Sequence, residues 1–173
     1  MDNFEQKHDV AFFSLCTFTR PYSKSVKWKK FKELYSDKAD LIISSSGGII
    51  PLEYENQYPF LTYDTTRLAK YNKLYIQKNY PKMKIFLNKF KYDYIIFNFR
   101  PTLRDVYLGR LIKKESENPD NIYIVPSKKV YKLAKKNGFK PSGGYNPDLS
   151  YEVLNEINEA FEEIEKKKKG GYL

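Results

Sequence analysis

Hydrophobic residues occur along the chain in short runs separated by polar stretches, and this alternation predicts buried strands joined by amphipathic helices. The runs are rich in β-branched and aromatic residues, and polar residues, proline or glycine follow them. Such runs are typical of strands that are covered on both faces of a sheet. Strands are therefore predicted at residues 10–16, 41–43, 92–99 and 121–125.

Between these runs, apolar residues recur every three or four positions, as on one face of an α-helix. In residues 24–35 the positions Val26, Phe31, Leu34 and Tyr35 form such a face, which leaves Lys27 and its neighbouring lysines for solvent or phosphate. Ser23 or Ser25 is the expected N-cap of this helix, and Ser127 that of the basic helix ending at residues 137–138. Further helices are predicted at residues 66–79, 81–91, 101–114 and 149–169.

Strands that alternate with helices predict the α/β class, as a three-layer α/β/α arrangement around a mostly parallel sheet. The length of 173 residues fits a single domain, with a disordered basic tail at about residues 166–173. Loops that follow Cys16, Ser44 and Phe99 are then expected at the carboxyl ends of the strands, where such sheets bind ligands.

The charge balance changes the picture of possible partners. Lysine and arginine number 31 against 21 acidic residues, a formal net charge of +10. This excess favours a polyanion such as nucleic acid, because binding releases counterions. A lysine-rich solvated surface with no such partner is the alternative interpretation.

Cysteine content and hydropathy exclude other classes. Cys16 is the only cysteine, so the sequence indicates no internal disulfide and no zinc cluster, and no metal or cofactor is predicted. The polar N-terminus and strand-sized apolar runs predict no membrane span and a soluble, cytoplasmic protein.

Two ordered motifs follow the first two predicted strands. The first contains Cys16, Arg20-Pro21-Tyr22, Ser25 and Trp28. The second runs from Ser44 to Glu55 and continues to Tyr63-Asp64. In their residues and spacing they resemble the core domain of archaeosine synthase, an archaeal family, although Arg20 replaces a lysine of the family motif and Trp28 a histidine.

The resemblance implies a fold similar to that of uracil-DNA glycosylases and a function in tRNA modification. Members of the family act on tRNA that carries the deazaguanine base preQ0, and add an amine, with free lysine implicated as donor, to its nitrile to form an amidine. Their RNA-binding domain has no counterpart in this length, so a partner chain that carries one is expected.

Three side chains are candidates for the chemistry. Cys16 at a strand end could add to a nitrile as a thiolate, with Arg20 lowering its pKa, or be a small buried residue that closes the sheet. Glu53 and Asp64 could act as general acid and base, or recognise a cationic amine or the base. Glu55 is expected to be a solvated loop residue.

The candidates for substrate binding lie in the same loops. Arg20, Tyr22 and Ser25 are placed to meet a phosphate or a base edge at a helix start. Ser45 and Gly48 belong to a small-residue run where backbone approaches a ligand closely. Arg100 is predicted to contact phosphate or, alternatively, to belong to surface charge or a helix-start ion pair with Asp105. Trp28 is expected in the core, and His8 on the surface.

Two functions stay open on these residues. The chain could be an amidine-forming enzyme, or a non-catalytic module that binds tRNA or the deazaguanine beside a catalytic partner. The replacements at Arg20 and Trp28 favour the module if the family's residues are catalytic. A base-excising hydrolase ranks last, because the sequence offers no obvious Asp/His pair to activate water.

Overall fold

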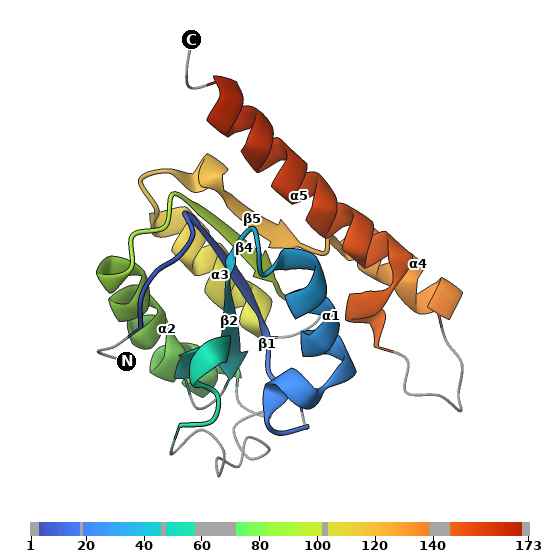
Figure 1. Cartoon of the computed structure of the whole chain (residues 1–173), viewed down its shortest axis with the longest axis horizontal. Helices are drawn as coiled ribbons and strands as arrows, with labels where there is room; N and C mark the ends of the chain where they lie inside the picture. Colours follow the sequence, from blue (N-terminus) through green and yellow to red (C-terminus); the bar gives the residue numbers. More distant parts are fainter. Residues whose placement is uncertain are drawn as a thin grey trace.

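In a computed structural model, the described residues are 4–17, 19–45, 48–57, 72–101, 104–138 and 146–170. They form a five-stranded sheet in the order β3-β2-β1-β4-β5 with helices on both faces (Figure 1). The strands are β1 (Val10–Leu15), β2 (Asp40–Ser45), β3 (Gly48–Pro51), β4 (Tyr94–Asn98) and β5 (Ile122–Val125). The α-helices are α1 (Val26–Tyr35), α2 (Asn72–Lys89), α3 (Asp105–Glu115), α4 (Lys128–Gly138) and α5 (Tyr151–Gly170). Short 3-10 helices are η1 (Tyr22–Lys24), η2 (Leu52–Tyr54), η4 (Pro119–Asn121) and η5 (Pro147–Leu149).

The four predicted strands form a parallel set, which confirms the α/β class. β1 pairs in parallel with both β2 and β4, and β4 pairs in parallel with β5. Along β1, successive side chains point to opposite faces, so Phe12 and Phe13 enter different halves of the core. Both are fully buried, which explains the unbroken hydrophobic run.

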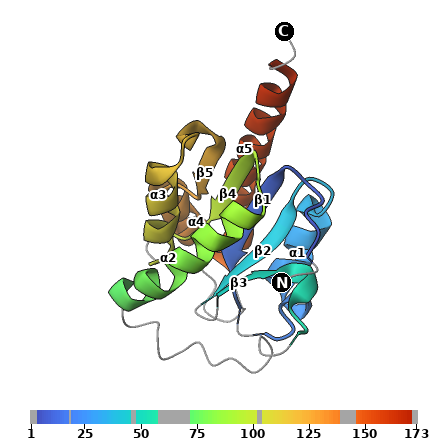
Figure 2. The same cartoon turned by 90° about the vertical axis from the view of Figure 1, so that its left-hand side faces the viewer.

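Two hydrophobic layers sandwich the sheet. One contains Phe12, Trp28 and Phe161 and lies under α1, α4 and α5. The other contains Phe13, Phe86 and Val106 and lies under α2 and α3. Figure 2 shows α2 and α3 on the opposite side of the strands from α1.

The strand β3 was not predicted. Residues 49–51, which are not assigned to a strand by the sequence pattern, pair antiparallel with β2, with Ile43 opposite Ile50. β3 lies at the edge of the sheet. Pro51, which has no N–H group, is tolerated in an edge strand because only one side of that strand needs partners.

The interruption predicted at Pro81 is wrong. α2 continues through this proline as a single helix. The buried side chains Tyr75, Met83 and Phe86 lie on both sides of it, and all three join the same hydrophobic layer. Packing along this shared face offsets the one hydrogen bond that proline removes. Residues 66–71, the expected start of the first helix, lie outside the described residues.

The helix predicted at residues 24–35 is present, but its buried face is rotated. Val26 is 75% exposed, whereas Lys27, expected in solvent, is buried with Trp28 and Phe31. Trp28 is thus a core residue, as expected. Ser25 is the N-cap, and its Oγ accepts a hydrogen bond from the Trp28 N–H at 3.2 Å.

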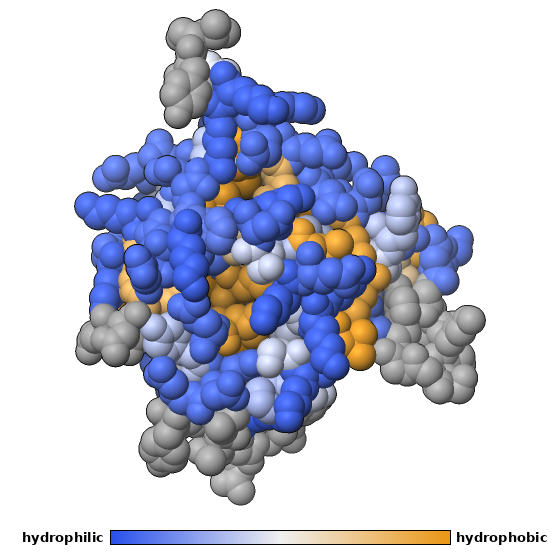
Figure 3. Space-filling view, viewed as in Figure 1, coloured by the Kyte–Doolittle hydropathy of each residue, from blue (hydrophilic) through white to orange (hydrophobic). Residues whose placement is uncertain are grey.

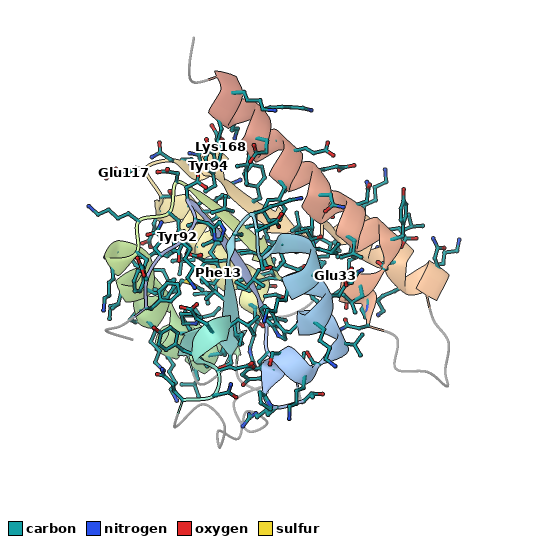
Figure 4. The ribbon with its side chains drawn as sticks, in the orientation of Figure 1. Phe13, Glu33, Tyr92, Tyr94, Glu117 and Lys168 are labelled. Carbon is teal, nitrogen blue, oxygen red and sulfur yellow. The ribbon has the colours of Figure 1, made fainter. Side chains whose placement is uncertain are left out.

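The structure also differs from the predictions at the start of α3 and at the end of α5. α3 begins at Asp105 rather than at Pro101, which lies in a turn. α5 extends to Gly170, so residues 166–170 are helical and not part of a disordered tail. Near the end of α5, Lys168 contacts residues of β4 and of the segment before β1. Its Nζ lies 2.9 Å from the Asp9 carboxylate and above the Tyr94 ring (Figure 4).

Polar side chains cover most of the face drawn in Figure 3, with apolar areas between them. The lysines of α4 at positions 128, 129, 132, 135 and 136 are exposed. Ser127 caps this helix, since its Oγ accepts from the Val130 N–H at 3.3 Å. Among the described helices, none is long and apolar enough to cross a membrane.

Candidate functional site

The carboxyl ends of β1 and β4 form the topological switch point of the sheet. From β1 the chain adds β2 on one side, and later β4 on the other. The loops that leave neighbouring strands therefore diverge here, which is where open α/β sheets bind ligands. Ser14, Cys16 and Asn98 lie at these strand ends.

A buried ion network closes this position from the α1 side. The Lys27 Nζ donates to the Leu15 carbonyl at 2.7 Å and to the Ser14 Oγ at 3.3 Å, and lies 3.4 Å from the Asp148 Oδ2. Arg100 binds the same carboxylate with two nitrogens, at 2.8 Å from Nε and 3.0 Å from Nη2. We call Lys27, Arg100 and Asp148 the triad.

Each charge of the triad depends on its neighbours. Burial lowers the pKa of the Lys27 ammonium, against the attraction of Asp148. Burial alone would raise the pKa of Asp148, but Lys27 and Arg100 outweigh it and hold that pKa below its usual value. Asp148 therefore remains a carboxylate that forms ion pairs with both Lys27 and Arg100.

An amide and a hydroxyl lie beside the triad. The Asn98 Nδ2 donates to the Ser14 Oγ at 3.1 Å, and both side chains are buried. The Asn98 Oδ1 is buried without a hydrogen-bond partner among the described residues. An unpaired buried acceptor costs free energy, so such a group points to a ligand that donates to it.

A second polar cluster lies at the end of β2. The Tyr75 hydroxyl donates to the buried Asp105 carboxylate and lies 3.3 Å from the Ser44 Oγ. The Arg104 guanidinium stacks on the Tyr75 ring at 4.0 Å from its centroid. Burial raises the pKa of Asp105, although Tyr75 and Arg104 oppose it.

Cys16 lies between the two clusters. Its N–H donates to the Ser44 carbonyl at 3.0 Å, and its side chain packs against the core. Burial raises the pKa of the thiol, even though Lys27, Arg104 and Arg20 act to lower it. The expected activation by Arg20 is therefore outweighed, and the thiol is protonated near neutral pH.

Comparison with known proteins gives a family without an assigned activity. Residues 1–131 match the model described as "Domain of unknown function (DUF5591)". The chain belongs to this family. Asp148 lies beyond the matched residues, so this triad member is contributed from outside them.

The DUF5591 match is accompanied by one structural relative. The crystal structure of AF0587, a protein of unknown function, is similar over 92% of this chain, with a TM-score of 0.63 and 14% sequence identity. This chain spans 46% of that chain, and the similarity concerns the fold alone. No curated protein matches.

The first sequence motif is held together around the start of α1. The Tyr22 ring is buried, with the Arg20 guanidinium 5.9 Å from its centroid. Burial raises the pKa of the Tyr22 hydroxyl. The Ser25 hydroxyl is occupied as the helix cap, so its contribution here is to position α1 and with it Lys27.

The second motif is split between two regions. Ser45 lies buried at the end of β2, and its Oγ donates to the Gly48 carbonyl at 3.5 Å. Gly48 adopts a φ of +144°, which favours glycine, and it begins β3 beside the Lys82 side chain. These two residues do lie at the carboxyl edge, as expected.

Glu53 lies elsewhere. The antiparallel β3 carries the chain from Gly48 to Pro51, which is opposite Ile42. Glu53 follows at the amino side of β2, where its carboxylate pairs with Lys7 at 2.6 Å. Glu53 and Cys16 are therefore not brought together by the fold, and Asp64 lies outside the described residues.

The expectation for Glu55 is wrong, and His8, though partly exposed, has a buried partner. Glu55 is only 4% exposed, and its Oε2 accepts the Ser23 N–H at 2.8 Å. The His8 Nδ1 lies 2.8 Å from the buried Asp40 carboxylate. Both contacts join segments more than 30 residues apart, so no local pattern reveals them.

Arg100 lies at the carboxyl edge as predicted, and its ion-pair partner among the described residues is Asp148 rather than Asp105. Its contact with phosphate stays a prediction. Lys27 and Asp148 were not predicted as site residues. The sequence offered one signal for Lys27: it lies on the same side of α1 as the apolar residues Trp28 and Phe31. In the described part of the chain, no group of three or more His, Cys, Asp or Glu side chains is placed to hold a metal ion.

Proposed function

We propose that the chain is a tRNA-binding module that recognises the deazaguanine base preQ0 between the ends of β1 and β4, and that it acts with a partner chain. The substrate comes from the resemblance to archaeosine synthase. The related proposal for the fold is that the parallel sheet with its switch-point site is of the uracil-DNA-glycosylase type, which holds an extruded base. We further propose that the protein acts in the cytoplasm, where tRNA is modified.

The observation that carries the proposal is the unpaired Asn98 Oδ1 at the switch point. The Nδ2 of the Asn98 amide is held by its hydrogen bond to Ser14, and its Oδ1 is an acceptor of the kind that pairs with the N–H groups of a base edge. The triad joins the ends of β1 and β4 to η5, which precedes α5. Exposed lysines on α4 supply the longer-range attraction to phosphate.

Three features support binding rather than catalysis. Trp28, which replaces the family's histidine, is completely buried and is a core residue. The Cys16 thiol has a raised pKa, so little thiolate is present near neutral pH. Glu53 lies away from the switch point, paired with Lys7.

The enzyme is the second candidate, because Cys16 lies among the cations Lys27, Arg104 and Arg20. A ligand that displaced water and brought a proton acceptor could shift this balance toward the thiolate. The thiolate would add to the nitrile carbon while the nitrile nitrogen takes up a proton, which forms a thioimidate. An amine such as lysine would then add to the same carbon and expel the thiolate, and the proton lost by the amine nitrogen would regenerate the thiol and leave the amidine.

One experiment separates the two candidates. The protein is titrated with preQ0-tRNA and with the same tRNA carrying guanine, and the nucleosides are then analysed by mass spectrometry after incubation with lysine. The module predicts about tenfold tighter binding of preQ0-tRNA and no mass change. A gain in mass equal to lysine addition would support the enzyme, and equal affinity without mass gain would contradict both.

The site itself is tested with Asn98→Leu, which removes the free acceptor at similar volume. We expect the preference for preQ0-tRNA over the guanine tRNA to disappear, while the salt dependence of binding stays the same. Asn88→Leu, at an exposed position of α2, is the matched control and should keep the preference. If Asn98→Leu retained the preference for preQ0-tRNA, the base would bind at another site.

A further inference from the structure

A cavity lies away from the switch point, between α1 and η2. Its volume is about 490 Å³, and residues of the N-terminal segment, α1, the start of β2 and η2 line it. Its apolar lining includes Leu41, Pro51 and Leu52. We call it the α1–η2 cavity.

The charges of this cavity differ in sign from those of the whole chain. Two lysines line it, Lys7 and Lys32, against three carboxylates, Asp40, Glu53 and Glu55. The complete sequence, in contrast, carries a formal charge of +10. The cavity is therefore a locally acidic place in a basic protein, which favours a cation over an anion.

Two of the three carboxylates are satisfied within the fold. Asp40 accepts from the Tyr92 hydroxyl at 2.9 Å and lies 2.8 Å from the His8 Nδ1. Glu53 is paired with the Lys7 ammonium at 2.6 Å. Neither needs a ligand.

Glu55 differs from both. It is 4% exposed, and its Oε2 accepts one hydrogen bond, from the Ser23 N–H. Within the described part of the chain it forms no ion pair, and its Oε1 accepts no hydrogen bond but keeps some contact with solvent at the cavity. A carboxylate that is largely buried loses most of its hydration, so a cation that reaches its free oxygen stabilises it.

We propose that the α1–η2 cavity binds a small alkylammonium ligand, whose ammonium group pairs with Glu55. The N–H groups of an ammonium can donate to the free Oε1 while Ser23 keeps Oε2. The apolar lining from Leu41 and Leu52 suits a short hydrocarbon chain. A metal ion fits less well, because it needs several oxygen ligands, and two of the three carboxylates of the cavity are already paired within the fold.

The test uses n-butylammonium as the probe and observes the backbone amide signals of Ser23 and Leu52 by NMR. We expect saturable shifts with a Kd of about 1 mM. 1-Butanol, of similar size and without charge, should bind at least about tenfold more weakly. Equal affinities for the two probes, or no shifts with n-butylammonium, would overturn the proposal.

Two variants locate the charge. Glu55→Gln keeps an oxygen that accepts the Ser23 N–H, so the fold is retained, and it should weaken n-butylammonium binding about tenfold or more. Glu53→Gln, at the more exposed carboxylate of the same cavity, should change the affinity less than about threefold. A larger loss in Glu53→Gln than in Glu55→Gln would contradict the assignment. None of these outcomes depends on tRNA binding.

Discussion

Asp148 and Glu55 are two carboxylates that are almost equally buried, at 2% and 4% exposure, but their surroundings are opposite. Asp148 contacts both Lys27 and Arg100 at the carboxyl edge of the sheet. Glu55 receives a single backbone hydrogen bond in the α1–η2 cavity. Burial alone therefore does not tell what a charged residue contributes.

The difference lies in where the counter-charge comes from. At Asp148 the protein supplies it, so the carboxylate stabilises the fold and holds η5 to α1 and to the end of β4. At Glu55 no described residue supplies it, so a bound cation is the natural complement. The same chemical change, carboxylate to amide, should have different consequences at the two positions.

The largest effect is expected from Asp148→Asn. It leaves the ammonium of Lys27 and the guanidinium of Arg100 without their anion, and we expect the free energy of unfolding to fall by about 3–5 kcal/mol. Urea unfolding followed by circular dichroism measures it. Asp37→Asn, at an exposed position, is the control and should change little. A loss below about 1 kcal/mol in Asp148→Asn would show that the triad does not stabilise the fold.

The acid dependence of stability should follow from the same residue. Because the folded-state pKa of Asp148 is lowered, the unfolded state binds more protons between the two pKa values. The stabilisation is complete above the unfolded value of about 3.9 and is lost as the pH falls through the folded value. We expect Asp148→Asn to flatten this acid slope, which is at most about 1.4 kcal/mol per pH unit for one group. Parallel slopes for both proteins would refute the assignment.

A smaller loss is expected from Lys27→Met. Asp148 keeps its two contacts with Arg100, so the change removes hydrogen bonds to Ser14 and Leu15 without stranding a charge. The free energy of unfolding should fall by about 1 kcal/mol. Combined with Asp148→Asn in a double-mutant cycle, it should show coupling, since the residues are in contact. A loss as large as that of Asp148→Asn would make Lys27, not Arg100, the main partner.

The smallest effect, and the opposite sign, is expected from Glu55→Gln. Without ligand, replacing an uncompensated buried charge by an amide should leave stability unchanged or raise it by about 0.5 kcal/mol. Thermal and urea unfolding of the ligand-free protein give the comparison. Destabilisation similar to that of Asp148→Asn would mean that Glu55 has a structural counter-charge, and would remove the contrast.

Much of the fold was predictable from local pattern. The runs around Phe12, Ile42, Ile96 and Ile122 predicted the four parallel strands, because strands covered on both faces need unbroken apolar sequence. The helix caps Ser25 and Ser127 could also be predicted from local sequence, since each hydroxyl accepts a hydrogen bond from the backbone N–H three residues later. Pro81 misled the prediction because long-range packing outweighed its local effect.

The sequence by itself determined the α/β class and which loops meet at the carboxyl edge, because strand–helix alternation restricts the connections. Only the tertiary structure decided the partners of the charges. Lys27 and Asp148 are 121 residues apart, and Ser23 and Glu55 are 32 apart. Helical periodicity shows which face is buried, but not that a lysine on that face meets a distant carboxylate. Whether a buried charge is compensated is a property of the assembled fold, and that property separates the triad from Glu55.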